Sequence, residues 1–143
     1  MTLTPTLDDK EVQALKDTLD DEYKARETYE QVIHDFGEVR PFINIVEAEA
    51  RHASALLNLF EKYGISPPPN RCAGKAPHFL SIYEACGTCI QNEIENVEIY
   101  DRALKSSRRP GIFTIYQVLG STSKDLHLPA FQRFEQSSRR GGL

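Results

Sequence analysis

The chain has 143 residues, a net charge of −4 and 27% charged residues, which is the size and composition of one globular domain. No apolar run is long enough for a membrane helix, and the N-terminus lacks the basic start and apolar run of a secretory signal. The basic pairs Arg108–Arg109 and Arg139–Arg140 have no interleaved aromatic residues, so we expect neither nucleic acid nor a membrane as a partner.

Clusters of glycine and proline divide the chain into four long segments, and apolar residues recur in each with the 3.6-residue period of a helix. The predicted helices cover about residues 8–36, 41–63, 77–105 and 110–135. Asp8 or Asp9 is the expected N-cap of the first helix, and Gly37 follows its end. Pro41 suits the first residue of the second helix. We expect Pro129 to bend the fourth helix, and the tail 137–143 to fray.

The connections between these helices predict an all-α fold, a four-helix bundle in one domain spanning residues 1–143. Gly37–Arg40 and Ser106–Arg109 are short, so the first and second helices pair antiparallel, as do the third and fourth. The connection Ile65–Ala76 holds three consecutive prolines and is not helical. Its 12 residues span up to about 40 Å, whereas a 22-residue helix is about 33 Å long. That length allows either a crossover, which makes the second and third helices parallel, or a simple up-down connection.

Three carboxylates fall on apolar helix faces. On a helical wheel, Glu22 and Glu49 lie within about 20° of the centre of their apolar stripes, and Glu93 within about 40°. His52 lies one turn after Glu49, and His127 points inward on the fourth predicted helix. Buried carboxylates without partners cost several kcal/mol each, so three in one core need a common partner. A pair of metal ions is the usual one.

The same residues form a weak internal repeat. Tyr29 follows Glu22 by seven residues, and Tyr100 follows Glu93 by seven. His52 follows Glu22 by 30 residues, and His127 follows Glu93 by 34. The repeat predicts one glutamate and one histidine from each half around a pseudo-twofold axis. Tyr29 and Tyr100 are then placed to donate hydrogen bonds to ligating carboxylates.

Divalent iron and manganese prefer carboxylate oxygen together with imidazole nitrogen, and a carboxylate is able to bridge two ions. This chemistry favours iron or manganese as the bound metal. The alternative is a buried salt-bridge network in which the three glutamates pair with Arg26, Arg51 or a lysine. Arg26 lies one turn from Glu22 on the inner face, which agrees with that alternative.

Three motifs, Glu22-Tyr-Lys-Ala-Arg-Glu-Thr-Tyr29, Glu49-Ala-Arg-His52, and Glu93 with Tyr100, resemble the ferritin-like diiron carboxylate proteins. The closest branch is that of rubrerythrin and bacterioferritin. The resemblance covers nearly the whole chain and implies a ferritin-like bundle with a crossover between helices two and three. The metal ligands that it implies are Glu22, Glu49, His52, Glu93 and His127. In this arrangement Glu49 bridges the ions, and Glu22 and Glu93 are terminal ligands.

The fourth predicted helix departs from the family pattern. Lys124 stands three residues before His127, where the family has a second bridging glutamate. A lysine there would be a second-shell residue that pairs with Glu49 or Glu93 and partly replaces a metal cation. On the wheel, however, Lys124 lies about 100° from the stripe centre, which is typical of a surface residue. Two ions, one ion and no ion are all compatible with this departure.

The three cysteines make no disulfide framework, which favours the reducing cytoplasm. Cys86 and Cys89 lie two turns and one turn before Glu93 on the same helix face. They are either a redox pair beside the metals or thiols that pack the core. We favour packing, because Cys-x-x-Cys within a helix is poor disulfide geometry. Met1 is the only methionine, so haem bound as in bacterioferritin is not expected.

The resemblance implies an iron-binding protein that acts as a ferroxidase or as a rubrerythrin-like peroxidase. It would hold two iron ions, with one ion or manganese as the alternatives. The iron–sulfur module of rubrerythrins is absent from the sequence, so an external electron donor protein is expected. Family members usually assemble, so we expect a homo-oligomer, a dimer or larger. The alternative function is a metal-binding or cargo bundle without turnover, in which Lys124 has altered the site.

Overall fold

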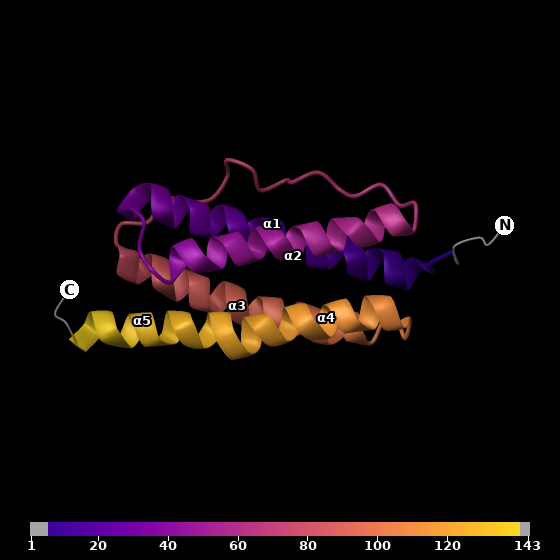
Figure 1. The fold of residues 1–143 in the computed structure, drawn as a ribbon. Coiled ribbons are helices and arrows are strands. Elements are labelled where there is room, and N and C mark those ends of the chain that lie inside the picture. Colours follow the sequence, from indigo (N-terminus) through magenta and orange to yellow (C-terminus); the bar gives the residue numbers. More distant parts are fainter. Residues whose placement is uncertain (1–5, 141–143) are drawn as a thin grey trace.

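A computed structural model describes residues 6–140, and in this range the fold is all-helical, as predicted (Figure 1). The helices are α1 (Asp9–Phe36), α2 (Phe42–Lys62), α3 (Ile82–Leu104), α4 (Pro110–Thr122), the π-helical turn η1 (Ser123–His127) and α5 (Leu128–Arg140). Because α4, η1 and α5 follow one another without a break, they form one rod. The described chain therefore consists of four rods that lie side by side. None of its helices has the length and apolarity needed to cross a membrane.

Figure 1 shows how the rods are connected. α1 and α2 run in opposite directions and are joined at one end by a short turn. The segment 63–81 then returns along the outside of α1 and α2, so α2 and α3 point the same way. It is held to α1 by Glu27, which accepts hydrogen bonds from Asn70 Nδ2 (3.0 Å) and from the Gly74 backbone (3.4 Å). α1 packs against α2 and α3, and α3 packs against the rod formed by α4, η1 and α5.

The buried apolar side chains form two clusters. The first includes Leu15, Leu19, Leu56, Phe60 and Tyr116. The second includes Val32, Phe42, Ile45, Cys86 and Phe131. Along α1, one cluster contributes residues before position 22 and the other contributes residues after it. A polar centre therefore lies between two apolar ends, and both ends help to exclude water from it.

Two predicted helix boundaries were wrong. α3 begins at Ile82 rather than near Pro77, because Ser81 is its N-cap and the Ser81 hydroxyl accepts a hydrogen bond from the Glu84 backbone at 3.1 Å. The last helix was expected to end near Glu135, and it continues to Arg140. Phe131 and Phe134 pack their rings on Phe42, at centroid distances of 5.3 and 5.4 Å, and hold this end of the rod. The remainder of the predicted frayed tail, 141–143, lies outside the described residues.

The π-helical turn η1 interrupts the fourth rod just before Pro129. The Leu128 backbone N–H donates to the carbonyl of Ser123, five residues back instead of four. Proline has no N–H to donate, and its ring clashes with the carbonyl four residues earlier, here that of Asp125. A wider turn accommodates that carbonyl. The wider turn also places Ser123 and His127 inward together, whereas Lys124 and Asp125 are exposed.

Candidate metal centre

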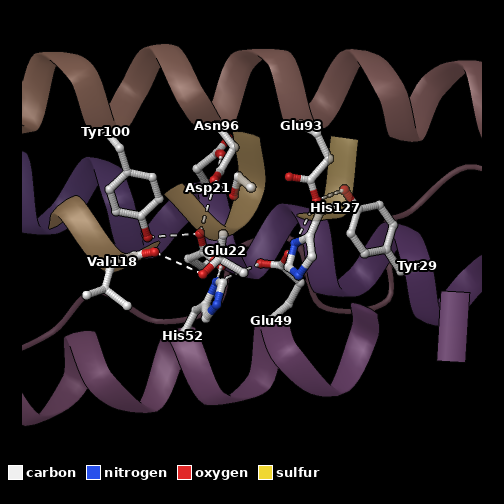
Figure 2. A network of polar contacts seen from close by, with 12 residues as sticks. Asp21, Glu22, Tyr29, Glu49, His52, Glu93, Asn96, Tyr100, Val118 and His127 are labelled. Atoms are coloured by element: carbon white, nitrogen blue, oxygen red, sulfur yellow. Dashed lines mark hydrogen bonds and ion pairs between the residues drawn. The ribbon is translucent and has the colours of Figure 1, made fainter. Parts of the chain in front are cut away.

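The structure brings the five predicted ligands together in the middle of the bundle (Figure 2). They come from every rod: Glu22 from α1, Glu49 and His52 from α2, Glu93 from α3, and His127 from η1. None of the five is more than 7% exposed. Charged side chains this deeply buried must be compensated by one another or by a bound ion.

Glu22, Glu49 and His52 form one trio. The Glu22 Oε1 atom accepts a hydrogen bond from the Tyr100 hydroxyl and another from the Asn96 amide, both at 2.9 Å. The Glu22 Oε2 atom lies 3.3 Å from His52 Nδ1 in hydrogen-bond geometry. His52 Nδ1 is also 3.6 Å from Glu49 Oε2. Both oxygens of Glu22 are therefore occupied by protein donors.

Glu49, Glu93 and His127 form the second trio, and Glu49 belongs to both. His127 Nδ1 lies 2.9 Å from Glu49 Oε1 and 3.3 Å from Glu93 Oε1. The Tyr29 hydroxyl donates to Glu93 Oε1 at 3.0 Å. Each tyrosine thus holds the glutamate of the other hairpin, Tyr29 that of α3 and Tyr100 that of α1. Figure 2 shows Tyr100 and His52 on the Glu22 side, and Tyr29 and His127 on the Glu93 side.

The donor atoms of this site fit a pair of metal ions. Within each trio, one ligand atom per residue lies within 4.8 Å of the others, and the shared Glu49 places a carboxylate between the two positions. Four buried ligand atoms have no aligned hydrogen-bond partner: both oxygens of Glu49, Glu93 Oε2 and His127 Nδ1. Each buried polar atom left unsatisfied costs about 1–3 kcal/mol. Carboxylate and imidazole donors are the set that divalent iron and manganese prefer.

The electrostatics of the site favour bound cations. Burial, together with the negative charge of Glu49, raises the pKa of Glu22 to about 8, against a lowering contribution from His52. Burial alone would lower the pKa of both histidines. Their carboxylate neighbours outweigh that effect and raise the pKa of His52 to about 10 and that of His127 to about 9. Two imidazolium ions therefore balance the carboxylates when no metal is bound, and metal binding must release their protons.

The predicted alternative, a salt-bridge network with arginine, is not what the structure shows. Arg26 pairs with Glu30 at 3.1 Å on an exposed part of α1, and Arg51 is exposed. Among the described residues, the ion pairs of the three buried glutamates are made with His52 and His127. Both partners are histidines, a residue type that commonly binds metal ions.

Of the two predicted positions of Lys124, against Glu49 or Glu93 or on the surface, the structure shows the second. Its side chain is exposed, and the inward residue one turn before His127 is Ser123. The Ser123 hydroxyl donates to Asn96 Oδ1 at 2.5 Å, and the Asn96 amide donates to Glu22 Oε1 and to Asp21 Oδ2 at 2.6 Å. A hydroxyl that orients Asn96 thus faces the site one turn before His127, where the ferritin-like resemblance implied a carboxylate. The wider turn of η1 leaves residue 124 exposed, and residue 123, four residues before His127, faces inward.

Sequence reasoning gave no role to Asn96 or Ser123. Asn96 follows Glu93 by three residues and precedes Tyr100 by four, the spacing of one helix face, and this signal was available. Ser123 precedes His127 by four residues, which is also the spacing of one helix face, and the sequence placed it near the inward His127 without giving it a role. The π-turn that begins at Ser123 was not predicted. The position of Pro129, six residues later, was the only hint in the sequence.

The cysteines on α3 pack in the second apolar cluster. Cys86 and Cys89 are fully buried, and the Cys86 thiol donates to the Phe131 carbonyl at 3.2 Å. Burial raises the pKa of Cys86 to about 12 and that of Cys89 well above its ordinary value. Both are free thiols and stay protonated near neutral pH. A protonated, buried thiol is a poor nucleophile, which agrees with a packing role.

Over residues 11–141 the chain matches a family described as "Uncharacterized protein domain (DUF2202)". No curated protein matches the chain. Among solved structures it is similar to the crystal structure of a hypothetical protein from Methanococcus jannaschii DSM 2661, with a TM-score of 0.83 and 19% sequence identity. The similarity covers 97% of this chain and 86% of the other. At 19% identity, this similarity shows a shared fold alone.

Proposed function

The chain belongs to the DUF2202 family, whose description names no activity, and we propose that it is a ferritin-like metalloprotein with a two-ion centre in its core. The ions are iron, with manganese as the alternative. One observation carries this proposal: two trios of ligand atoms share Glu49, and four of the buried ligand atoms have no aligned hydrogen-bond partner. The parallel direction of α2 and α3 in Figure 1 supports the ferritin-like topology.

In the proposed site, Glu22 and His52 hold one ion, and Glu93 and His127 hold the other. Glu49 bridges the two, since it is common to both trios. Three carboxylates offset most of the charge of two divalent ions in a core from which the apolar clusters exclude water. Tyr29 and Tyr100 fix the orientation of Glu93 and Glu22 by donating hydrogen bonds. Burial raises the pKa of both tyrosines well above the ordinary value, so they remain donors.

Iron bound in this site would supply one-electron chemistry toward O₂ or peroxide, which is the basis of a ferroxidase or peroxidase activity. The chain's own part is to bind and orient the ions and to keep water away from them. Electrons for repeated turnover would come from an external donor protein. A second candidate is metal binding without turnover. One observation favours it: Ser123, and not a carboxylate, is the inward residue before His127.

The test is the amount of Fe(II) bound per chain under anaerobic conditions. We expect about two ions in the wild type and almost none in Glu49→Ala, because this change removes the ligand common to both positions. The control is Glu47→Ala, an exposed glutamate on the same helix, which should bind as the wild type does. Circular dichroism should show the same helix content in all three proteins. Undiminished iron binding in Glu49→Ala would overturn the proposal.

Exposure of the loaded wild type to air separates the two candidate functions. Rapid formation of protein-bound Fe(III), followed by its absorbance, supports the ferroxidase or peroxidase. Iron that stays bound and reduced supports metal binding without turnover. Glu49→Ala should bind almost no iron, so neither protein-bound Fe(III) nor bound Fe(II) should be found with that variant.

A further inference from the structure

The two halves of the candidate metal centre differ in how far their ligand atoms are already satisfied by the protein. The first half consists of Glu22 and His52, and the second consists of Glu93 and His127. Glu49 lies between them and belongs to both. The internal repeat of the sequence relates the halves, but their hydrogen bonds are not equivalent.

In the Glu22–His52 half, both oxygens of Glu22 and Nδ1 of His52 have hydrogen-bond partners. Glu22 Oε1 accepts from both Tyr100 and Asn96, and Glu22 Oε2 forms a hydrogen bond with His52 Nδ1. The Asn96 amide is itself held by the Ser123 hydroxyl. An ion that binds here must break the contact between Glu22 and His52, and it finds one Glu22 oxygen already committed to two donors.

In the Glu93–His127 half, ligand atoms are buried without aligned partners. His127 Nδ1 and Glu93 Oε2 have none, and neither oxygen of Glu49 has one. Glu93 Oε1 accepts a hydrogen bond only from Tyr29. His127 Nδ1 is close to both glutamates without pointing at either oxygen in hydrogen-bond geometry. One ligand atom of each of the three residues lies within 4.8 Å of the others. An ion there replaces the ion pair of His127 with Glu49, which is not aligned as a hydrogen bond, and satisfies these atoms.

We infer that the two positions fill in a fixed order: the first ion binds Glu49, Glu93 and His127, and the second binds Glu22 and His52 more weakly. This inference rests on the proposed function. The first ion gains Glu49 Oε1, Glu93 Oε2 and His127 Nδ1, which have no aligned hydrogen-bond partner. The second ion must displace the hydrogen bond between Glu22 and His52, and it must share Glu49 with the first ion. The tightly bound ion is then a resident one, and the Glu22–His52 position is where ions exchange.

A titration with Co(II), whose visible absorbance reports its coordination, tests this order. The variants are a matched pair, His127→Ala and His52→Ala, each of which removes one imidazole. The wild type should bind two ions with affinities that differ by about tenfold or more. His52→Ala should keep the tight event and lose the weak one. His127→Ala should lose the tight event and keep at most a weak one.

The isosteric pair Glu93→Gln and Glu22→Gln repeats the test should an alanine variant fail to fold. The fixed order would be overturned if His52→Ala or Glu22→Gln lost the tightly bound ion, or if the two histidine variants had equal effects. Either result would leave the two-ion site itself intact. A wild type that binds no Co(II) would overturn the proposed function and this inference with it. Calorimetry gives the same stoichiometries without relying on the spectrum.

Discussion

Glu11 is a buried carboxylate with a structural role. Its Oε2 atom accepts hydrogen bonds from the Ser107 hydroxyl at 2.6 Å and from Arg109 Nε at 2.8 Å. Its Oε1 atom accepts from the Asp8 backbone at 3.0 Å and completes the capping box of α1. Both oxygens are satisfied by the protein, whereas both oxygens of Glu49 are not. This contrast separates a structural carboxylate from a candidate ligand.

Glu11 also makes stability depend on pH. Burial acts to raise its pKa, but hydrogen bonds from Ser107 and the Asp8 backbone, together with Arg109, hold the pKa below its ordinary value. The ionised group therefore contributes stability above about pH 4.3, and this contribution is lost as the pH falls through the lowered pKa. Glu11→Gln should lower the free energy of unfolding near pH 7 by about 1–3 kcal/mol.

Urea unfolding of the wild type and Glu11→Gln over a range of pH measures this effect. The difference between the two proteins should shrink as the pH falls below about 4. Glu38→Gln, an exposed change near the other end of α1, is the control and should have little effect at any pH. A difference that does not change with pH would contradict the assignment to Glu11 ionisation.

At the scale of the element, η1 decides which side chain of the fourth rod faces the site. Within an uninterrupted α-helix, residues 123 and 124 would both lie about one turn before His127, at the i, i+4 and i, i+3 spacings. The π-turn places Ser123 and His127 inward and leaves Lys124 exposed. Because this turn contains one extra residue, the side chain that faces the site is the Ser123 hydroxyl and not the charged Lys124. Through Asn96, that hydroxyl supports the orientation of Glu22.

Because Lys124 is exposed, Lys124→Glu should leave both the iron bound per chain and the rate of Fe(II) oxidation unchanged. The measurement is anaerobic iron content, followed by the absorbance of Fe(III) after air is admitted. A rise in stoichiometry or rate that disappears in the double variant Lys124→Glu with His127→Ala would show that residue 124 reaches the metals. That result would contradict the inward position of Ser123.

At the scale of the whole molecule, the site and the fold are coupled. The carboxylates and histidines come from all four rods and lie between two apolar clusters, so they can meet only in the folded protein. An ion that binds this set binds the folded state alone and stabilises it by mass action. At a free metal concentration 100 times Kd, this stabilisation is about 2.7 kcal/mol.

Addition of Mn(II), or of Fe(II) without oxygen, should therefore raise the Tm of the wild type by roughly 10 °C, given about 2.7 kcal/mol and a chain of this size. Thermal unfolding followed by circular dichroism measures the shift. Glu49→Ala should unfold at the same temperature with and without metal. A wild-type Tm that does not change on addition of either metal would contradict this coupling between metal binding and folding.

The sequence alone determined those features that depend on short-range patterns. The 3.6-residue period and the glycine and proline clusters identified the all-helical class and most helix ends, because both signals act within a few residues. The same period placed Glu22, Glu49 and Glu93 on inner faces, and all three are buried. The start of α3 was wrong because the capping role of Ser81 was not considered, although such a cap is a local signal.

The tertiary structure decided everything that depends on contacts between rods. Only packing pairs Tyr29 with Glu93 and Tyr100 with Glu22, because a periodicity gives the face of a residue and not its partner across the core. Only the folded fourth rod shows the π-turn that brings Ser123 inward. It also shows which histidine is left without an aligned partner. Hydrogen-bond satisfaction is a property of the assembled core, and in this protein it distinguishes the two halves of the candidate metal site.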